Sequence, residues 1–103
     1  MSETNLRRAR RVYFDAAQRM VVITLNDASV HAIPVDRLEM VESTPDAWVP
    51  IQNLSDEQLA DVEVFGAGAY ILWDELGQSF SVDNLFNGIY GRPAWMESLV
   101  ALA

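Results

Sequence analysis

The clearest pattern in the first third of the chain is an alternation of apolar and polar positions. It covers residues 10–15, 20–25 and 30–35, which are separated by short polar links. Side chains of a strand alternate between its two faces, so the second stretch places Val21 and Ile23 on one face. The pattern therefore predicts three consecutive strands joined by turns.

The pattern changes after the third strand. Residues 36–41 fit a short helix that Asp36 caps, with Glu39 in the reciprocal position three residues later. Leu38 and Val41 would then face the core. Residues 43–53 contain two prolines and show no clear period, so we expect a loop there.

A second helix is signalled more strongly. Ser55 and Gln58 have the spacing of a capping box, in which each side chain bonds the backbone of the other residue. We therefore expect a helix over residues 56–61. A short apolar run at 62–65 then predicts a return to strand.

Two glycines, Gly66 and Gly68, follow this strand and raise the possibility of a phosphate-binding loop. A dinucleotide loop needs a third glycine where this chain has Ile71, and a long helix after it. A Walker loop needs a lysine, and the chain has none. Residues 69–73 are rich in β-branched and aromatic side chains, so we expect the glycines to form the corner of a hairpin.

The C-terminal third alternates between turn, strand and helix signals. A short strand is expected at 79–82, and Ser81 can cap a helix that ends near Gly91. Pro93 suits the first turn of a last helix, which carries Trp95 on an apolar stripe. We expect both Trp73 and Trp95 to lie in the core.

The segment GAYILWDELGQSFSVDNLFNGIYGRPAW, residues 68–95, resembles the bacterial domain of unknown function family 2442. That family typically shows a glycine turn, an aliphatic residue before tryptophan and a serine–valine helix start. Some members also show a late aromatic–glycine pair followed by tryptophan. The matching positions here are Gly68, Leu72, Trp73, Leu76, Ser81, Val82, Leu85, Phe86, Gly88, Tyr90, Gly91 and Trp95. The resemblance runs from about Arg11 to Trp95 and is looser through Thr44–Gln52.

The resemblance implies a small α+β domain with a strongly bent antiparallel sheet. With the strand and helix signals above, we expect about five strands and three to four short helices in a single domain over residues 12–103. The resemblance implies no known reaction. Members of the family are often suspected to be antitoxin-like partners of another small domain, of unknown function family 4160, and some are joined to a helix-turn-helix domain.

The chain departs from the family at two positions. The family often carries aspartates two residues apart after the leucine, and Gly77 and Ser79 occupy those positions here. A function that depends on those acids would be missing from this protein. A capping role in the turn could still be filled by Gly77 and Ser79.

Composition narrows the classes of function. The 103 residues suit one domain, and the absence of cysteine removes disulfides, thiolate nucleophiles and cysteine-based metal sites. The net charge is −8, with five arginines and two acids in residues 1–19 and two arginines against thirteen acids in residues 20–103. An acidic body repels DNA at long range, so we do not expect the whole domain to bind nucleic acid.

The residues that could support catalysis are few. His31 is the only histidine, and we expect a surface or structural role for it. Asp74 and Glu75 are adjacent on a turn, so their side chains diverge. Asp56 and Glu57 open a helix, where negative charge is expected without any catalytic role. We therefore expect no catalytic residues, no metal site and no cofactor, and an unrecognised enzymatic site remains the third hypothesis.

The basic N-terminus is a stronger candidate for a functional feature than the histidine or the acid pairs. Arg7, Arg8, Arg10 and Arg11 stand in a segment, residues 1–11, that we expect to form a basic arm. Such an arm can contact nucleic acid weakly, because four arginines neutralise at most about four phosphates. The alternative is a solubilising tail.

The leading hypothesis is a non-enzymatic binding or regulatory module that engages a protein partner, encoded beside it, in the manner of an antitoxin-like accessory protein. We expect Trp48, between two prolines, to be the most exposed of the three tryptophans and to anchor the partner, with acidic contacts from Asp46, Asp74 and Glu75. The alternative is that Trp48 belongs to a loop lid packed over the sheet. A homodimer is conceivable. No apolar run approaches the ~20 residues that a membrane span needs, so we expect a cytoplasmic protein.

Overall fold

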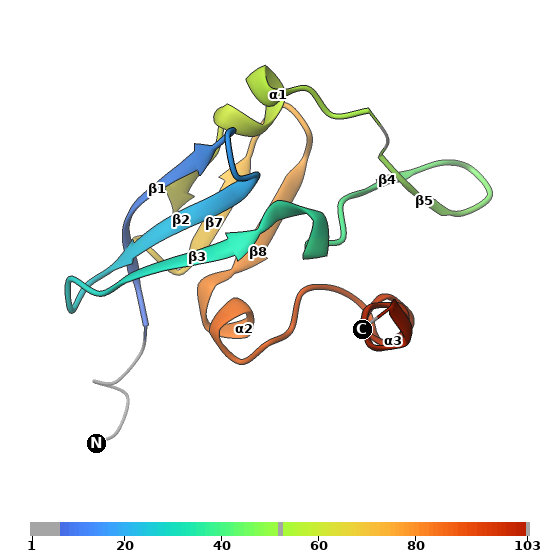
Figure 1. The fold of residues 1–103 in the computed structure, drawn as a ribbon. Helices are drawn as coiled ribbons and strands as arrows, with labels where there is room; N and C mark the ends of the chain where they lie inside the picture. The colour runs from blue at the N-terminus through green and yellow to red at the C-terminus, as the bar shows by residue number, and fades with distance from the viewer. Residues whose placement is uncertain (1–6, 52, 103) are drawn as a thin grey trace.

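Two three-stranded antiparallel sheets and one two-stranded hairpin form the framework of the protein (Figure 1). The structure is a computed structural model and describes residues 7–51 and 53–102. The first sheet has the order β1 (Ala9–Asp15), β2 (Met20–Leu25), β3 (Val30–Pro34). The second has the order β6 (Glu63–Phe65), β7 (Tyr70–Trp73), β8 (Gln78–Ser81), and the hairpin joins β4 (Val41–Ser43) to β5 (Trp48–Pro50).

The helices are short and follow the strands at intervals. They are the 3-10 turn η2 (Val35–Arg37) and the α-helices α1 (Asp56–Ala60), α2 (Val82–Phe86) and α3 (Pro93–Leu102). The α+β class is therefore confirmed, but the described residues hold eight strands in three sheets rather than about five in one bent sheet. None of the helices in residues 7–51 and 53–102 has the length and apolarity needed to cross a bilayer.

The core lies where the two three-stranded sheets meet, because β1 runs beside β6 and β7. Val21 and Ile23 are fully buried, as the alternation in the sequence predicted, and they belong to one cluster with Ile71 and Trp73. The indole Nε1 of Trp73 donates a 2.8 Å hydrogen bond to the carbonyl of Leu59, so its polar atom is satisfied inside the core.

The glycine-rich link between β6 and β7 is a hairpin corner, as predicted. Gly66 and Gly68 both have positive φ, and the amide of Ala69 donates to the carbonyl of Gly66. A Cβ at Gly68 would lie 2.6 Å from the carbonyl oxygen of Ala9. Glycine is therefore required here so that β1 can approach the corner, where the Ala9 amide donates to the Gly68 carbonyl over 2.8 Å.

The expected loop at 43–53 is wrong in part, because β5 pairs with β4 in an antiparallel hairpin. Its turn is closed by Thr44, whose amide and hydroxyl both donate to the carbonyl of Ala47. Pro50 is tolerated in β5 because that strand is an edge. Strands of three residues are too short to show a period of two.

The helix expected at 36–41 is reduced to the single turn η2, and Val41 lies in β4. The two acids expected to form its cap bind elsewhere. Asp36 forms an ion pair with Arg19 over 2.8 Å, and Glu39 forms one with Arg92 over 2.6 Å. Long-range ion pairs therefore replace the local capping bonds.

The helix signals elsewhere are confirmed more closely. Ser55 and Gln58 form the predicted capping box at the start of α1. Ser81 caps α2, but that helix ends at Phe86 rather than near Gly91. α3 begins at Pro93 as predicted, and its Trp95 is only half-buried, with Nε1 donating to the carbonyl of Arg37.

Candidate partner-binding groove

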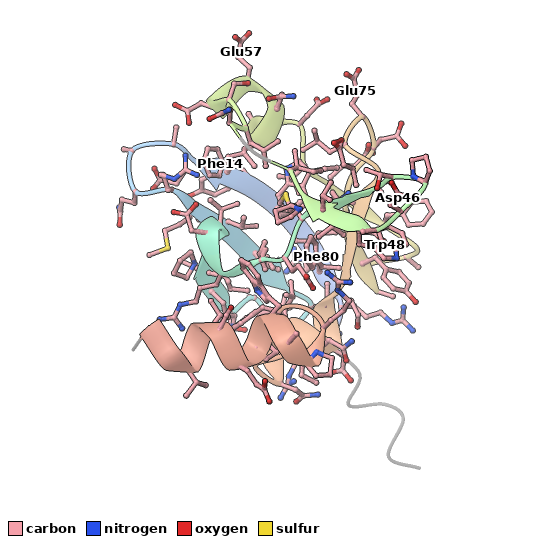
Figure 2. All side chains as sticks on the ribbon, turned by 90° about the vertical axis from the view of Figure 1, so that its right-hand side faces the viewer. Phe14, Asp46, Trp48, Glu57, Glu75 and Phe80 are labelled. Carbon is pink, nitrogen blue, oxygen red and sulfur yellow. The ribbon has the colours of Figure 1, made fainter. Side chains whose placement is uncertain are left out.

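A groove of about 460 Å³ lies between the β4–β5 hairpin, the edge strand β8 and the link from α2 to α3. Trp48 and Val41 line it from the hairpin, Ser79 and Phe80 from β8, and Tyr90 from the link. Figure 2 shows Trp48 and Phe80 on the face of the molecule from which the hairpin projects. The groove therefore combines apolar walls with the open edge of a sheet.

Trp48 is the most exposed residue of the groove whose side chain is large and apolar. Its side chain is on β5, opposite Ser43, and the residue is 58% exposed. In Figure 1 the hairpin that carries it stands away from the two larger sheets. The expectation that Trp48 is exposed is confirmed, and an exposed tryptophan beside a groove is the kind of residue that anchors a protein partner.

Gln78 holds the hairpin against β8. It is buried, its Oε1 accepts from the amide of Val41 over 3.1 Å, and its Nε2 donates to the Val41 carbonyl over 2.6 Å. Nε2 also donates to the carbonyl of Leu76 over 2.9 Å. One side chain thereby replaces a rung of backbone pairing between β4 and β8.

Glu39 and Arg92 fix the far wall of the groove. The Glu39 side chain is 10% exposed, and its Oε2 accepts from Arg92 Nη2 over 2.6 Å. The backbone amide of Arg92 also donates to Glu39, and the Glu39 amide donates to the carbonyl of Tyr90. Hydrogen bonds from the Arg92 guanidinium lower the pKa of Glu39 below its ordinary value, so this carboxylate stays charged and committed to the link.

None of the acidic residues expected to contact a partner lines the groove. Asp46 is exposed on the hairpin turn two residues before Trp48. Asp74 and Glu75 are exposed on the turn between β7 and β8. Glu75 borders a separate hollow of about 240 Å³ with Glu57, and Figure 2 shows both side chains projecting from the same end of the molecule.

Gly77 and Ser79, where the family resembled above often has aspartates, both line the groove. Gly77 has φ +65 and open space around its α-carbon, so it needs glycine for its backbone and not for packing. Positions 77 and 79 therefore contribute no negative charge to the groove.

The basic segment is less free than an arm. Residues 9–11 of the expected arm belong to β1. Of its described residues only 7 and 8 precede the sheet, and residues 1–6 lie outside the described part of the chain. Arg7 lies 3.6 Å from Asp83 and donates to Asn87, and Arg8 donates to the carbonyl of Ala67. The remaining two arginines, at positions 10 and 11, are exposed on β1.

His31 is exposed on β3 and contacts neighbouring side chains of the fold. Its Nε2 is 2.8 Å from the hydroxyl of Ser29, and its ring packs edge-on against Phe86 at 4.6 Å between centroids. Within residues 7–51 and 53–102, no three His, Cys, Asp or Glu side chains are grouped as metal ligands.

Sequence reasoning missed Gln78, Phe80 and the Glu39–Arg92 pair as parts of one site. Their spacing along the chain carries no signal, because residues separated by 37 and 53 positions meet only in the folded protein. The usable signal was a tryptophan in a segment that contains two prolines and shows no clear period.

Comparison with known proteins shows the fold and not the function. No protein-family model and no curated protein matches the chain. The structure is similar to the crystal structure of a protein of unknown function from Rhodospirillum rubrum ATCC 11170, with a TM-score of 0.75 and 28% sequence identity. The match covers 89% of this chain and 99% of that chain. The α+β arrangement therefore recurs in a solved protein of nearly the same extent.

Proposed function

We propose that this protein is a non-enzymatic binding module that holds a basic protein partner at the groove beside Trp48. The observation that carries the proposal is an exposed tryptophan at the rim of an apolar groove on a strongly acidic part of the chain. Residues 38–103 contain eleven acidic residues and one arginine, Arg92. Electrostatic attraction would speed encounter with a basic partner, and Trp48 would supply much of the affinity.

The polar groups of the groove support binding rather than chemistry. Glu39 and Arg92 bind one another, and the hydroxyl of Ser81 accepts from the amide of Asn84. A serine nucleophile needs a free base within hydrogen-bond reach, and His31 does not line this groove. An enzymatic role therefore has less support than a binding role.

A partner encoded beside this protein, in an antitoxin-like arrangement, is part of the proposal. It rests on the resemblance to family 2442 and on the acidic charge, which suits the neutralisation of a basic protein. Residence in the cytoplasm belongs to the same proposal.

A nucleic-acid role through the arginines has weaker support, because Arg7 and Arg8 already contact the rest of the domain. Arg10 and Arg11 could still meet phosphate. Replacing both by glutamine leaves β1 in place and should leave the mobility of labelled DNA and RNA in a gel unchanged. A shift by the wild type that the double variant loses would favour the nucleic-acid role over our proposal.

The test is affinity capture from the native host with tagged wild-type protein and with Trp48→Ala. We expect one or more small basic proteins to be retained at low salt and released at about 0.5 M salt, where exposed charges are strongly screened. Trp48→Ala should lose most of this capture. Equal capture by both proteins, or none at any salt, would contradict the proposal.

A further inference from the structure

β8 presents an unpaired strand edge to the groove. In the described part of the chain its only strand neighbour is β7, whereas β6, at the opposite edge of the same sheet, runs beside β1. The wall of the groove is formed by residues of β8 itself, including Ser79, Phe80 and Ser81. An open edge with an apolar hollow beside it is suited to the addition of an extended segment.

The pairing with β7 determines which backbone groups of β8 face the groove. The register places Tyr70 opposite Ser81 and Ile71 opposite Phe80, and the amide of Val82 donates to the carbonyl of Ala69. Hydrogen-bonded and non-bonded pairs alternate along an antiparallel ladder. Phe80 therefore bonds back to β7, while the amides of Ser79 and Ser81 and the carbonyl of Ser79 point away from β7, toward the groove that these residues line. The carbonyl of Ser81, the N-cap of α2, belongs to the helix.

The hairpin leaves this edge open although it lies close by. Gln78 bonds the backbone of Val41 through its side chain, which holds β4 beside the start of β8 without strand pairing. Trp48, on the hairpin, and Phe80, on β8, both line the groove. An added strand would be covered by Trp48 on one side and bonded to β8 on the other.

We infer that an extended basic segment of the partner adds to β8 as a fourth, hydrogen-bonded strand. The inference rests on the proposed function and names the way in which the partner binds. Side chains of the added strand would alternate, with apolar residues toward Phe80 and Trp48 and basic residues toward the exposed acids.

The charge of the chain identifies the occupant as a different protein. A second copy would bring another net charge of −8, and the two copies would repel one another. The described basic residues near the N-terminus of this chain are already placed in or beside β1. Exposed Glu42 and Asp46 on the hairpin favour a segment that carries lysine or arginine.

The experiment compares Ser81→Pro with Ser81→Ala. Both variants lose the hydroxyl that caps α2, but only proline removes the amide that faces the groove. Ser81 has φ −68, which proline adopts without strain, so both variants should fold alike. Their melting temperatures and far-ultraviolet circular dichroism check this.

The probe is the set of ten-residue peptides selected on the wild-type protein from a random phage-display library. We expect selected peptides to alternate apolar residues with lysine or arginine and to lack proline. Ser81→Pro should bind a selected peptide at least about tenfold more weakly than Ser81→Ala. Selection of acidic or helical peptides, selection of none, or affinities of the two variants within about twofold would overturn strand addition.

Amide hydrogen exchange gives a second readout that does not depend on a variant. The amides of Ser79 and Ser81 should gain protection when the peptide binds. Protection confined to β3 or β6 would place the peptide elsewhere and overturn the inference. If Trp48→Ala loses the partner while Ser81→Pro and Ser81→Ala keep it equally, the proposed function stands and strand addition fails.

Discussion

At the scale of single residues, contacts at Gly68 and Glu39 hold distant segments together. Gly68 lets the backbone of β1 approach the corner between β6 and β7. Glu39 binds Arg92 and thereby fixes the link that forms one wall of the groove. Each residue makes its contact with a segment more than 50 positions away, so changes at either should affect the assembly of the fold rather than local structure alone.

Gly68→Ala should destabilise the protein by about 2–4 kcal/mol, because a Cβ would meet the Ala9 carbonyl at 2.6 Å and the backbone has φ +92. Gly77→Ala is the matched control. It has φ +65 and nothing within 4 Å, so only the backbone cost of about 1 kcal/mol applies. Urea denaturation of the two variants measures the difference. Equal losses of stability would show that the contact with β1 is not tight.

Protonation of Glu39 should lower the unfolding free energy of the protein in acid. Because its folded pKa is lowered, its contribution is present above the ordinary glutamate pKa of about 4.3 and is lost as pH falls through the folded value. Glu39→Gln should flatten the fall in unfolding free energy between about pH 5 and pH 3. Asp36 and Asp27 also have lowered pKa values, so part of the slope should remain.

The control for this pH dependence is Glu97→Gln on α3, since Glu97 forms no ion pair among the described residues. Denaturant titrations at a series of pH values give the slopes. A slope that Glu39→Gln leaves unchanged would contradict the role assigned to the Glu39–Arg92 pair.

At the scale of elements, the β4–β5 hairpin depends on the second sheet. Gln78, at the start of β8, satisfies both backbone groups of Val41. The hairpin carries Trp48, so the position of the candidate anchor is set by a side chain 37 residues away from the hairpin's first residue. We therefore expect the shape of the groove to depend on this contact.

Gln78→Ala should lower the unfolding free energy by about 1–3 kcal/mol, because it leaves the Val41 amide and carbonyl without their partner. It should also speed amide exchange through β4 and β5. Gln58→Ala removes a glutamine of the exposed capping box and should leave hairpin exchange unchanged. Hydrogen exchange followed by mass spectrometry distinguishes them, and unchanged exchange in the Gln78 variant would argue against the coupling.

The same elements explain what the sequence could predict. β1, β2 and β3 are long enough to show alternation, and the capping box of α1 lies within four residues, so both were predicted. The corner at Gly66 and Gly68 was predicted because glycine adopts positive φ readily, which is a local property of the backbone. The hairpin, the shortened helix at 36–41 and the groove were not, because Gln78 and Arg92 act on residues far from them in the chain.

At the scale of the whole molecule, exposed acids and an exposed tryptophan occur together on the β4–β5 hairpin. Residues 20–103 hold thirteen acids and two arginines, and the exposed acids Glu42 and Asp46 lie on the hairpin that carries the exposed Trp48. The arginines are concentrated before residue 20, at the start of the first sheet. A basic partner would therefore be drawn toward the hairpin and repelled from β1.

Asp46→Lys should slow association with the captured partner several-fold and reduce its dependence on salt, with little change in dissociation rate. Its exposed position at the hairpin turn makes it a rim charge. Glu63→Lys changes the same charge on β6, outside the groove, and should slow association less. Surface plasmon resonance at two salt concentrations gives the rates. Equal effects of the two variants would mean that net charge, and not the hairpin face, guides the encounter.

The most direct test of the central claim is photo-crosslinking from the groove. Trp48 is replaced by the photoreactive residue p-benzoylphenylalanine. The complex of this variant with the captured partner is then irradiated. Phe65, 54% exposed on β6 and outside the groove, is replaced in parallel. We predict a covalent product with the partner from position 48 and none from position 65. A product from position 65 alone would contradict the assignment of this groove as the binding site.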